Sequence, residues 1–332
     1  MHYGRRALLL MPLMAALPPA MAHAAGTQAA GARAAGPPIR IGTLRFGSVA
    51  WELDVMRAHG LDAAAGVTVE LVEFAAAQAT QVALQAGRVD MVVQDWLWVS
   101  RQRASGADWT LSPTFGALGA VMAAPDSPVR TVADLRGRRL GVAGSPLDKS
   151  WLLLRAYAQQ KLGLDLDQAA DKSFGPPPLL AEQMAAGRLD AVLTYWPFAA
   201  RAEAAGQRRV LAMEDAVEAM GIPPGVPFLG WVFSDAFAAR NAAAVQGFID
   251  ASAKARSILV DSDAEWDRIA PLTGTSGPDE LARLRSWYRR GALGHWDLEA
   301  TARLYDILAA IGGPALVGPA VHLAPGTFWS PS

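Results

Sequence analysis

The 332-residue chain contains no cysteine. It therefore cannot form a disulfide, offers no thiolate to a metal or to nucleophilic catalysis, and lacks the residue that carries the lipid of an exported lipoprotein. Charged residues are also scarce, at 18%, and they are nearly balanced, with 30 basic and 31 acidic side chains. A net charge of −1 is too small to indicate nucleic acid or an anionic membrane as a partner.

Histidine is scarce too. The chain has five, and His59, His295 and His322 are the ones that lie beyond the first 24 residues. Their spacing fits neither a metal site nor a serine-histidine-acid arrangement. The glycine-rich stretches lack the Walker and dinucleotide patterns. We therefore expect no cofactor and no enzyme activity.

The chain has one notable apolar run near its N-terminus, from Ala7 to Leu17. Arg5 and Arg6 precede this run, and small residues follow it up to Ala24. A basic, then apolar, then small-residue order predicts a secretory signal peptide over residues 1–24, whose removal changes the net charge to −3. The run is shorter than the roughly 20 residues of a membrane-spanning helix. The twin-arginine and general export routes both stay open.

A segment of the sequence occurs twice, one hundred positions apart. Residues 86–106 and 186–206 align without a gap and are identical at nine positions. Each copy has the pattern of a helix end, a glycine that closes it, and a short apolar strand followed by aromatic residues. The identical positions in the first copy are Ala86, Gly87, Arg88, Asp90, Val92, Trp96, Arg101, Ala104 and Gly106. This repeat predicts two similar lobes that face each other across a cleft.

The apolar pattern around the copies alternates strands with helices. Residues 39–44 and 67–74 fit strands, and helical patterns follow each of them. A β-α-β-α-β order predicts an α/β fold with a parallel sheet. Two extended glycine-containing stretches, 114–125 and 225–233, are the predicted crossings between lobes. The predicted organisation is a flexible lead-in at 25–38, lobe I at 39–118 plus 229–332, and lobe II at 119–228.

In order and spacing, several of these segments resemble a known family. They are Ile39-Arg40-Ile41-Gly42 and the segments 66–71, 84–90, 134–142 and 186–190, spread over residues 39–260. The family comprises the extracytoplasmic solute-binding proteins of ATP-binding-cassette (ABC) importers for nitrate, sulfonates, taurine and thiamine precursors. The chain departs from the family pattern at residues 94–98, where small residues are usual.

The resemblance implies a type II periplasmic-binding-protein fold, with two parallel-sheet lobes joined by two crossover strands. It also implies a monomer in the periplasm that binds a small-molecule solute, here anionic or planar organic, and delivers it to a membrane permease. By domain closure, such a ligand selects the state that the permease recognises.

Ligands of open parallel sheets bind beyond the carboxyl ends of the strands. We therefore expect the site to be assembled from residues that follow the strands of both lobes. The candidates are Arg45, Phe46, Ser48, Gln78, Gln94, Asp95, Trp96, Gly144, Ser145, Lys149, Tyr195 and Trp196.

Gly144 and Ser145 precede a predicted long helix and form a candidate anion seat. Backbone N–H groups and the positive end of the helix dipole would meet there, with Lys149 in the first turn. The alternative is ordinary capping, in which Ser145 is the N-cap and Asp148 completes a capping box.

Other candidates offer an ion pair and aromatic contacts. Arg45 can form a two-pronged bond to an anionic ligand, or a surface salt bridge. Asp95 can pair with Arg45 across the cleft or receive a ligand amine. Trp96 and Trp196 are predicted to form a common aromatic wall, with burial in the core as the alternative.

The differences between the copies are predicted to set specificity, and their shared residues to form scaffold. Gln94 and Asp95 stand opposite Thr194 and Tyr195 in the aligned copies. The shared aspartates at the strand beginnings are expected to hold the helix-to-strand turn instead.

Two further hypotheses remain open. In one, Asp95, Asp148 and Glu214 supply oxygen ligands to a hard metal cation or a cationic solute. In the other, the chain is an exported enzyme on the same fold.

Overall fold

The computed structural model describes residues 37–45, 47–75, 77–292 and 295–330. These residues all belong to one compact unit. The predicted signal peptide, most of the lead-in and the candidate Phe46 lie outside the described residues. None of the described helices combines the length and the apolar character that a membrane crossing requires.

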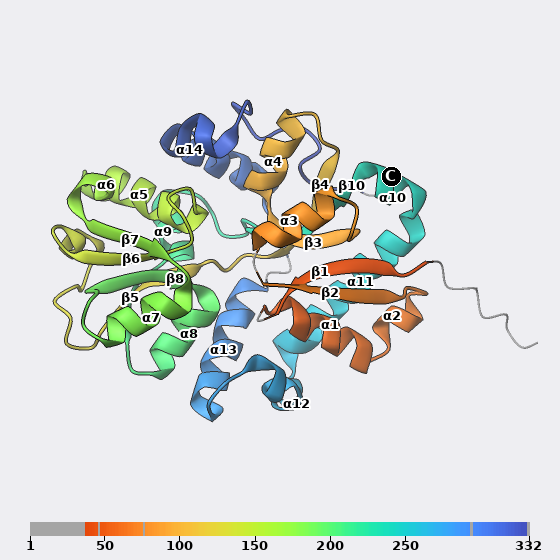
Figure 1. Cartoon of the computed structure of the whole chain (residues 1–332), viewed down its shortest axis with the longest axis horizontal. Coiled ribbons are helices and arrows are strands. Elements are labelled where there is room, and N and C mark those ends of the chain that lie inside the picture. Colours follow the sequence, from red (N-terminus) through yellow and green to blue (C-terminus); the bar gives the residue numbers. More distant parts are fainter. Residues whose placement is uncertain (1–36, 46, 76, 293–294, 331–332) are drawn as a thin grey trace, which may run out of the picture. The chain divides into compact units, whose positions relative to one another are not determined.

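One five-stranded sheet belongs to lobe I. Strand order and bounds are β2 (Val69–Phe74), β1 (Ile39–Leu44), β3 (Met91–Asp95), β10 (Leu229–Ser234) and β4 (Trp109–Phe115). Strands β1, β2 and β3 are parallel, whereas β10 pairs antiparallel with both of its neighbours. The sheet is therefore made from the first third of the chain and one strand that arrives much later (Figure 1).

The second sheet, in lobe II, repeats this plan. Its order is β7 (Asp171–Gly175), β6 (Arg139–Ala143), β8 (Ala191–Tyr195), β5 (Gly119–Ala123) and β9 (Arg208–Ala212). Here β5 is the antiparallel strand. Each sheet thus contains the predicted parallel strands together with one antiparallel strand, and both sheets are mixed. The chain enters lobe II through β5 and returns to lobe I through β10. Each of these strands begins at the edge of the sheet where the parallel strands end, so it must be antiparallel to them.

Helices cover both sheets (Figure 1). Their bounds are α1 (Val49–Ala58), α2 (Leu61–Ala64), α3 (Ala77–Gln85), α4 (Trp96–Ala104), a 3-10 turn at Val132–Leu135, α5 (Lys149–Leu162), α6 (Leu166–Ala169), α7 (Pro177–Ala185), α8 (Trp196–Ala204), α9 (Met213–Ala219), α10 (Asp235–Arg240), α11 (Ala242–Asp261), α12 (Asp263–Thr273), α13 (Pro278–Gly291) and α14 (Leu298–Val317).

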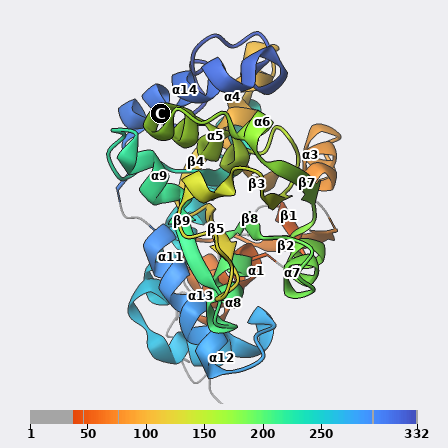
Figure 2. The same ribbon diagram turned by 90° about the vertical axis from the view of Figure 1, so that its left-hand side faces the viewer.

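The C-terminal helices contact both lobes. Helices α11 and α12 pack on α1, in lobe I. Figure 2 shows α13 beside α8 and α14 beside α5, and both are contacts to lobe II. At the first of these, Arg201 donates to Glu280 over 2.8 Å and the Trp287 indole donates to Glu203 over 2.9 Å. The C-terminal segment therefore bridges the lobes instead of packing on lobe I alone.

An arginine–aspartate pair fastens the beginnings of two parallel strands in each lobe. In lobe I, the backbone N–H and the guanidinium of Arg40, in β1, donate to Asp90, just before β3, over 2.7–3.0 Å. In lobe II, Arg139 and Asp190 make the same three bonds between β6 and β8. Such charge-assisted, two-pronged bonds are strong and directional. The repeated aspartates therefore hold the sheets at the edge opposite the cleft.

We expect Asp90→Asn to lower the free energy of unfolding by about 1–2 kcal/mol, because the amide NH2 cannot accept a bond from Arg40 and the remaining bonds lose the carboxylate charge at a partly exposed site. Urea denaturation measures this change. The control is Asp126→Asn, which removes an exposed carboxylate from a loop of lobe II. Equal effects of the two substitutions would contradict a scaffold role for Asp90.

Candidate functional site

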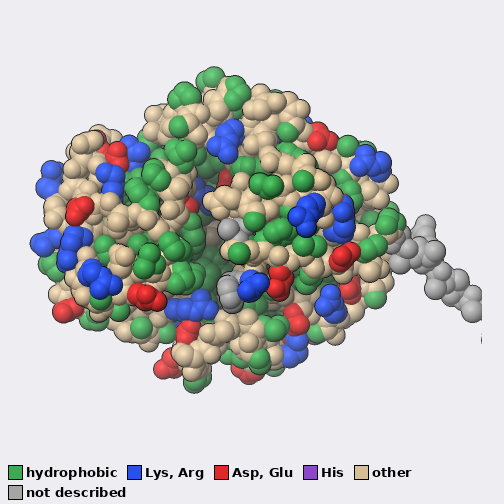
Figure 3. Space-filling view, in the orientation of Figure 1, with side chains coloured by type: hydrophobic (Ala, Val, Ile, Leu, Met, Phe, Trp, Pro, Cys, Tyr) green, Lys and Arg blue, Asp and Glu red, His purple; other side chains and the backbone are tan. Residues whose placement is uncertain are grey.

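The carboxyl ends of the parallel strands in the two sheets face each other. Asp95 ends β3 in lobe I, and Lys149 begins α5 in lobe II. The Lys149 Nζ atom lies 3.6 Å from Asp95 Oδ2, so an ion pair joins the lobes at this point. Figure 3 shows that the surface is hollowed between the lobes. This is the place in the described structure where groups of opposite charge from both lobes meet in the cleft.

Lys149 carries a positive charge in the cleft. Its side chain is 17% exposed. Burial of the ammonium lowers its pKa, but the attraction of Asp95 and Asp148 outweighs this, so the pKa of Lys149 lies above its ordinary value. The lysine is therefore protonated throughout the physiological range and can pair with an anion.

Asp148 is held from two sides. Its Oδ1 atom accepts the Ser150 N–H over 2.8 Å and caps α5, and its Oδ2 atom accepts the Tyr195 hydroxyl over 3.0 Å. Burial, and then the charge of Asp148, raise the pKa of the Tyr195 phenol well above its ordinary value. Tyr195 is therefore a neutral donor that fixes the orientation of the Asp148 carboxylate.

The expected start of α5 at Ser145 is wrong. The helix begins at Lys149, with Asp148 as its N-cap, and residues 145–148 form a turn in which the Ser145 hydroxyl accepts the Leu147 N–H. A carboxylate that also binds Tyr195 competes better for the positive end of the helix than a neutral hydroxyl does. The free N–H groups of the helix thus lie beside Asp148. A ligand contact at Gly144 or Ser145 stays a prediction.

Gly144 lets the loop before α5 approach Tyr195. Its φ is +96°, a backbone conformation that L side chains rarely adopt. A Cβ atom there would lie 2.7 Å from the Tyr195 hydroxyl and 2.8 Å from Asp148 Oδ2. The absence of a side chain at this position therefore permits the Tyr195–Asp148 bond.

Asp95 caps a helix and faces Lys149, whereas its neighbour Gln94 makes contacts within lobe I. Asp95 Oδ1 accepts the Trp98 N–H over 2.8 Å and caps α4, while Oδ2 faces Lys149. Gln94 is buried, accepts a bond from Gln81 and donates to Thr80. Its amide therefore joins β3 to α3 within lobe I.

The candidates near β1 and in α3 lie closer to solvent. Arg45 is 65% exposed, and its Nε atom lies 3.9 Å from Glu73 on the neighbouring strand, as in the surface salt-bridge alternative. Gln78 is exposed, and Ser48 precedes α1 without a side-chain capping bond. Of the two alternatives for Asp95, the pairing with Arg45 differs from the arrangement described, in which Asp95 faces Lys149 and Arg45 lies beside Glu73.

Trp96 and Trp196 begin α4 and α8 at equivalent positions of the repeat, but they are buried in different clusters. Trp96 is 1% exposed, packs near Tyr305 and donates its indole N–H to the Pro227 carbonyl. Trp196 is 5% exposed, and its ring centroid lies 5.4 Å from that of Phe115 and 6.0 Å from that of Trp51. The two rings do not form one wall in this structure. Their contact with a ligand stays a prediction.

The three acids of the metal hypothesis do not form one group, because Asp95 and Asp148 lie at Lys149 and Glu214 lies at Leu118. The described residues contain no group of three His, Cys, Asp or Glu side chains placed to hold a metal. Asp95 and Asp148 surround Lys149, whose charge repels a cation. Glu214 instead accepts the Leu118 N–H over 2.6 Å.

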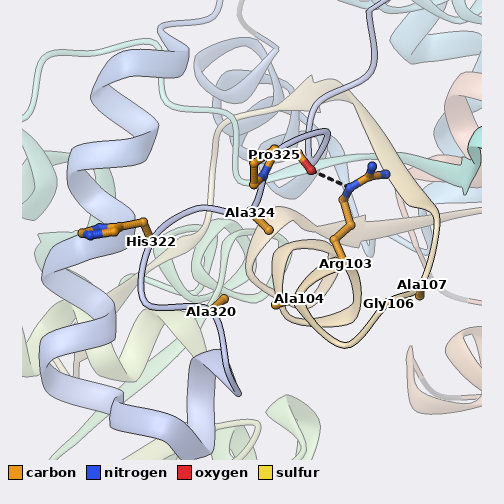
Figure 4. A pocket seen from close by; sticks show the side chains of 8 residues that line it. All are labelled: Arg103, Ala104, Gly106, Ala107, Ala320, His322, Ala324 and Pro325. Atoms are coloured by element: carbon orange, nitrogen blue, oxygen red, sulfur yellow. Dashed lines mark hydrogen bonds between the residues drawn. The ribbon is translucent and has the colours of Figure 1, made fainter.

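A separate hollow of 430 Å³ lies between the end of α4 and residues 320–325. Arg103, on its wall, donates to the Pro325 carbonyl over 2.7 Å, and His322 points away from the hollow (Figure 4). The other lining residues are small or apolar. Because Arg103 already binds the C-terminal segment, this hollow has fewer polar groups available for a ligand than the cleft has.

We expect Gly144→Ala to lower the free energy of unfolding by about 1–3 kcal/mol more than Gly163→Ala does. Both glycines have positive φ, but a Cβ at Gly163 would meet nothing within 4 Å. The control therefore isolates the collision with Tyr195 and Asp148. Urea denaturation of both variants measures the difference, and equal losses would contradict the close approach.

Comparisons with known proteins come from family models, sequences and structures. The model of the family described as NMT1/THI5 like matches residues 55–265. No curated protein sequence matches the chain. The chain resembles the periplasmic aliphatic sulphonate binding protein SsuA of Escherichia coli, at 20% identity and a TM-score of 0.72, over 90% of this chain and 94% of that one.

Two other solved structures extend the comparison. The alkanesulfonate-binding SsuA of Xanthomonas axonopodis pv. citri, bound to MOPS, has 20% identity and a TM-score of 0.69, over 89% and 99% of the two chains. The desulfurization enzyme DSZB has 17% identity and a TM-score of 0.56, over 86% and 97%. These likenesses confirm the predicted α/β fold of periplasmic binding proteins. Because binding proteins and an enzyme both have this fold, the fold does not by itself identify the function.

Proposed function

Because the chain belongs to the NMT1/THI5-like family, we propose that it is the solute-binding component of an ABC importer, a binding protein and not an enzyme. It captures a small solute between its lobes and presents the closed form to a membrane permease. Removal of the predicted signal peptide leaves it in the periplasm as a monomer. The observation that carries the proposal is the ion pair between Lys149 and Asp95, which joins the two lobes inside the cleft.

Lys149 selects a solute with an anionic group. Its ammonium is a charged donor in the cleft, and Asp95 neutralises it in the arrangement described. An anionic group of the solute replaces Asp95 as the partner of Lys149. Because both lobes then contact one ligand, the population of molecules with closed lobes increases. Sulfonates are suitable first test compounds, because the two SsuA proteins that resemble this chain bind them.

The solute itself is identified by mass spectrometry of the small molecules released when protein purified from its native host is denatured. Calorimetry then compares sulfonates, nitrate, carboxylates and pyrimidines. Stoichiometric, saturable binding of one anionic class supports the proposal. Binding of metal ions or cationic solutes only would contradict it, and so would conversion of the bound compound to a product.

We expect Lys149→Gln to weaken binding of that solute about tenfold to a hundredfold, because a hydrogen bond to a charged group is worth about 1.5–3 kcal/mol. Asp95→Asn is expected to strengthen binding, since it removes the competitor for the ammonium. Lys161→Gln, at the exposed end of the same helix, is the control. Calorimetry measures all three, and unchanged affinity in Lys149→Gln would refute the assignment of Lys149.

A further inference from the structure

The first crossing between the lobes is held at Leu118 from two sides. The Trp196 N–H donates to the Leu118 carbonyl over 2.9 Å, and the Leu118 N–H donates to Glu214 Oε1 over 2.6 Å. Both partners belong to lobe II. Two residues earlier, the Gly116 N–H donates to the Gly291 carbonyl, at the end of α13. The first crossing is therefore fastened to lobe II at Leu118 and to the end of α13 at Gly116.

Glu214 lies in the first turn of α9, and among the described residues one of its carboxyl oxygens, Oε1, has a hydrogen-bond partner. Its Oε2 atom is buried and makes no hydrogen bond among the described residues. The charged groups that act on it are Arg290 of α13 and its neighbour Asp215, which pair with each other over 3.5 Å. A full negative charge on Glu214 is therefore poorly compensated in this arrangement of the lobes.

We propose that Glu214 is a positioning residue of the hinge: loss of its proton shifts the lobes toward an arrangement in which Oε2 is reached by water. This coupling needs no ligand and goes beyond the proposed binding function. It acts through Leu118, because the carboxyl group holds that residue of the crossing by its backbone.

The direction of the shift follows from proton linkage. Burial raises the pKa of Glu214, and the Leu118 N–H and Arg290 offset this only in part. Below the ordinary pKa of a glutamate the protonated group is stable in the described arrangement. As the pH rises through the raised pKa, ionisation favours any arrangement in which that pKa is lower. Each unit of difference between the two values changes the population ratio about tenfold.

The absence of cysteine makes the lobe distance directly measurable. Cysteines introduced at the exposed positions Ala58, in lobe I, and Ala186, in lobe II, would carry two spin labels. Pulsed electron paramagnetic resonance on the ligand-free protein then gives the distance distribution at pH values from 4 to 8. We expect the distribution to shift along a single titration curve whose midpoint lies above the ordinary pKa of glutamate. No shift with pH overturns the proposal.

Substitutions assign the titration to Glu214. We expect Glu214→Gln to abolish the shift and the control Glu218→Gln, exposed one turn later in α9, to retain it. Arg290→Gln removes the positive charge near Glu214 and is expected to move the midpoint to higher pH, which tests the coupling even if the Glu214 variant does not fold. A shift that survives in Glu214→Gln, or a midpoint unmoved in Arg290→Gln, overturns the proposal. Because no ligand is present, neither result bears on the proposed binding function.

Discussion

The chain passes between its lobes at the edges where the parallel strands of each sheet end, and the other features of the molecule depend on this constraint. Strand β4 leaves lobe I there and β5 enters lobe II; β9 and β10 make the return. Each entering strand must therefore run antiparallel to its neighbours. The same geometry brings two sets of strand ends together, and residues from distant parts of the sequence line one cleft.

In each lobe, one edge of the sheet has the same residues in both copies of the repeat, and the other edge has different ones. At the far edge, the pairs of Arg40 with Asp90 and of Arg139 with Asp190 are the same in both copies. At the cleft edge the copies differ, and Asp95 stands where the second copy has Tyr195. Both residues act on the environment of Lys149, one directly and one through its bond to Asp148. The duplicated scaffold thus presents an asymmetric set of charges to the cleft.

Local pattern predicted the strands and helices well, because the apolar period and the closing glycines are encoded within short segments. It failed where distant groups compete. Ser145 satisfies every local rule for an N-cap, yet Asp148 takes the position because Tyr195, 47 residues away, supports it. Trp96 and Trp196 follow strands at the cleft edge, but Tyr305, Phe115 and Trp51 provide apolar surroundings for their rings. Short-range pattern contains no information about such partners.

The sequence by itself determined the α/β class, and it predicted two lobes, their crossings and a site at the strand ends. Those properties follow from periodicity, from a repeat and from a rule of sheet geometry. Only the tertiary structure decided that Asp95 pairs with Lys149 while Arg45 lies beside Glu73, and that Glu214 accepts the Leu118 N–H of the first crossing. The reason is that charges and buried hydrogen-bond donors choose their partners by distance in space, which the order of residues along the chain does not specify.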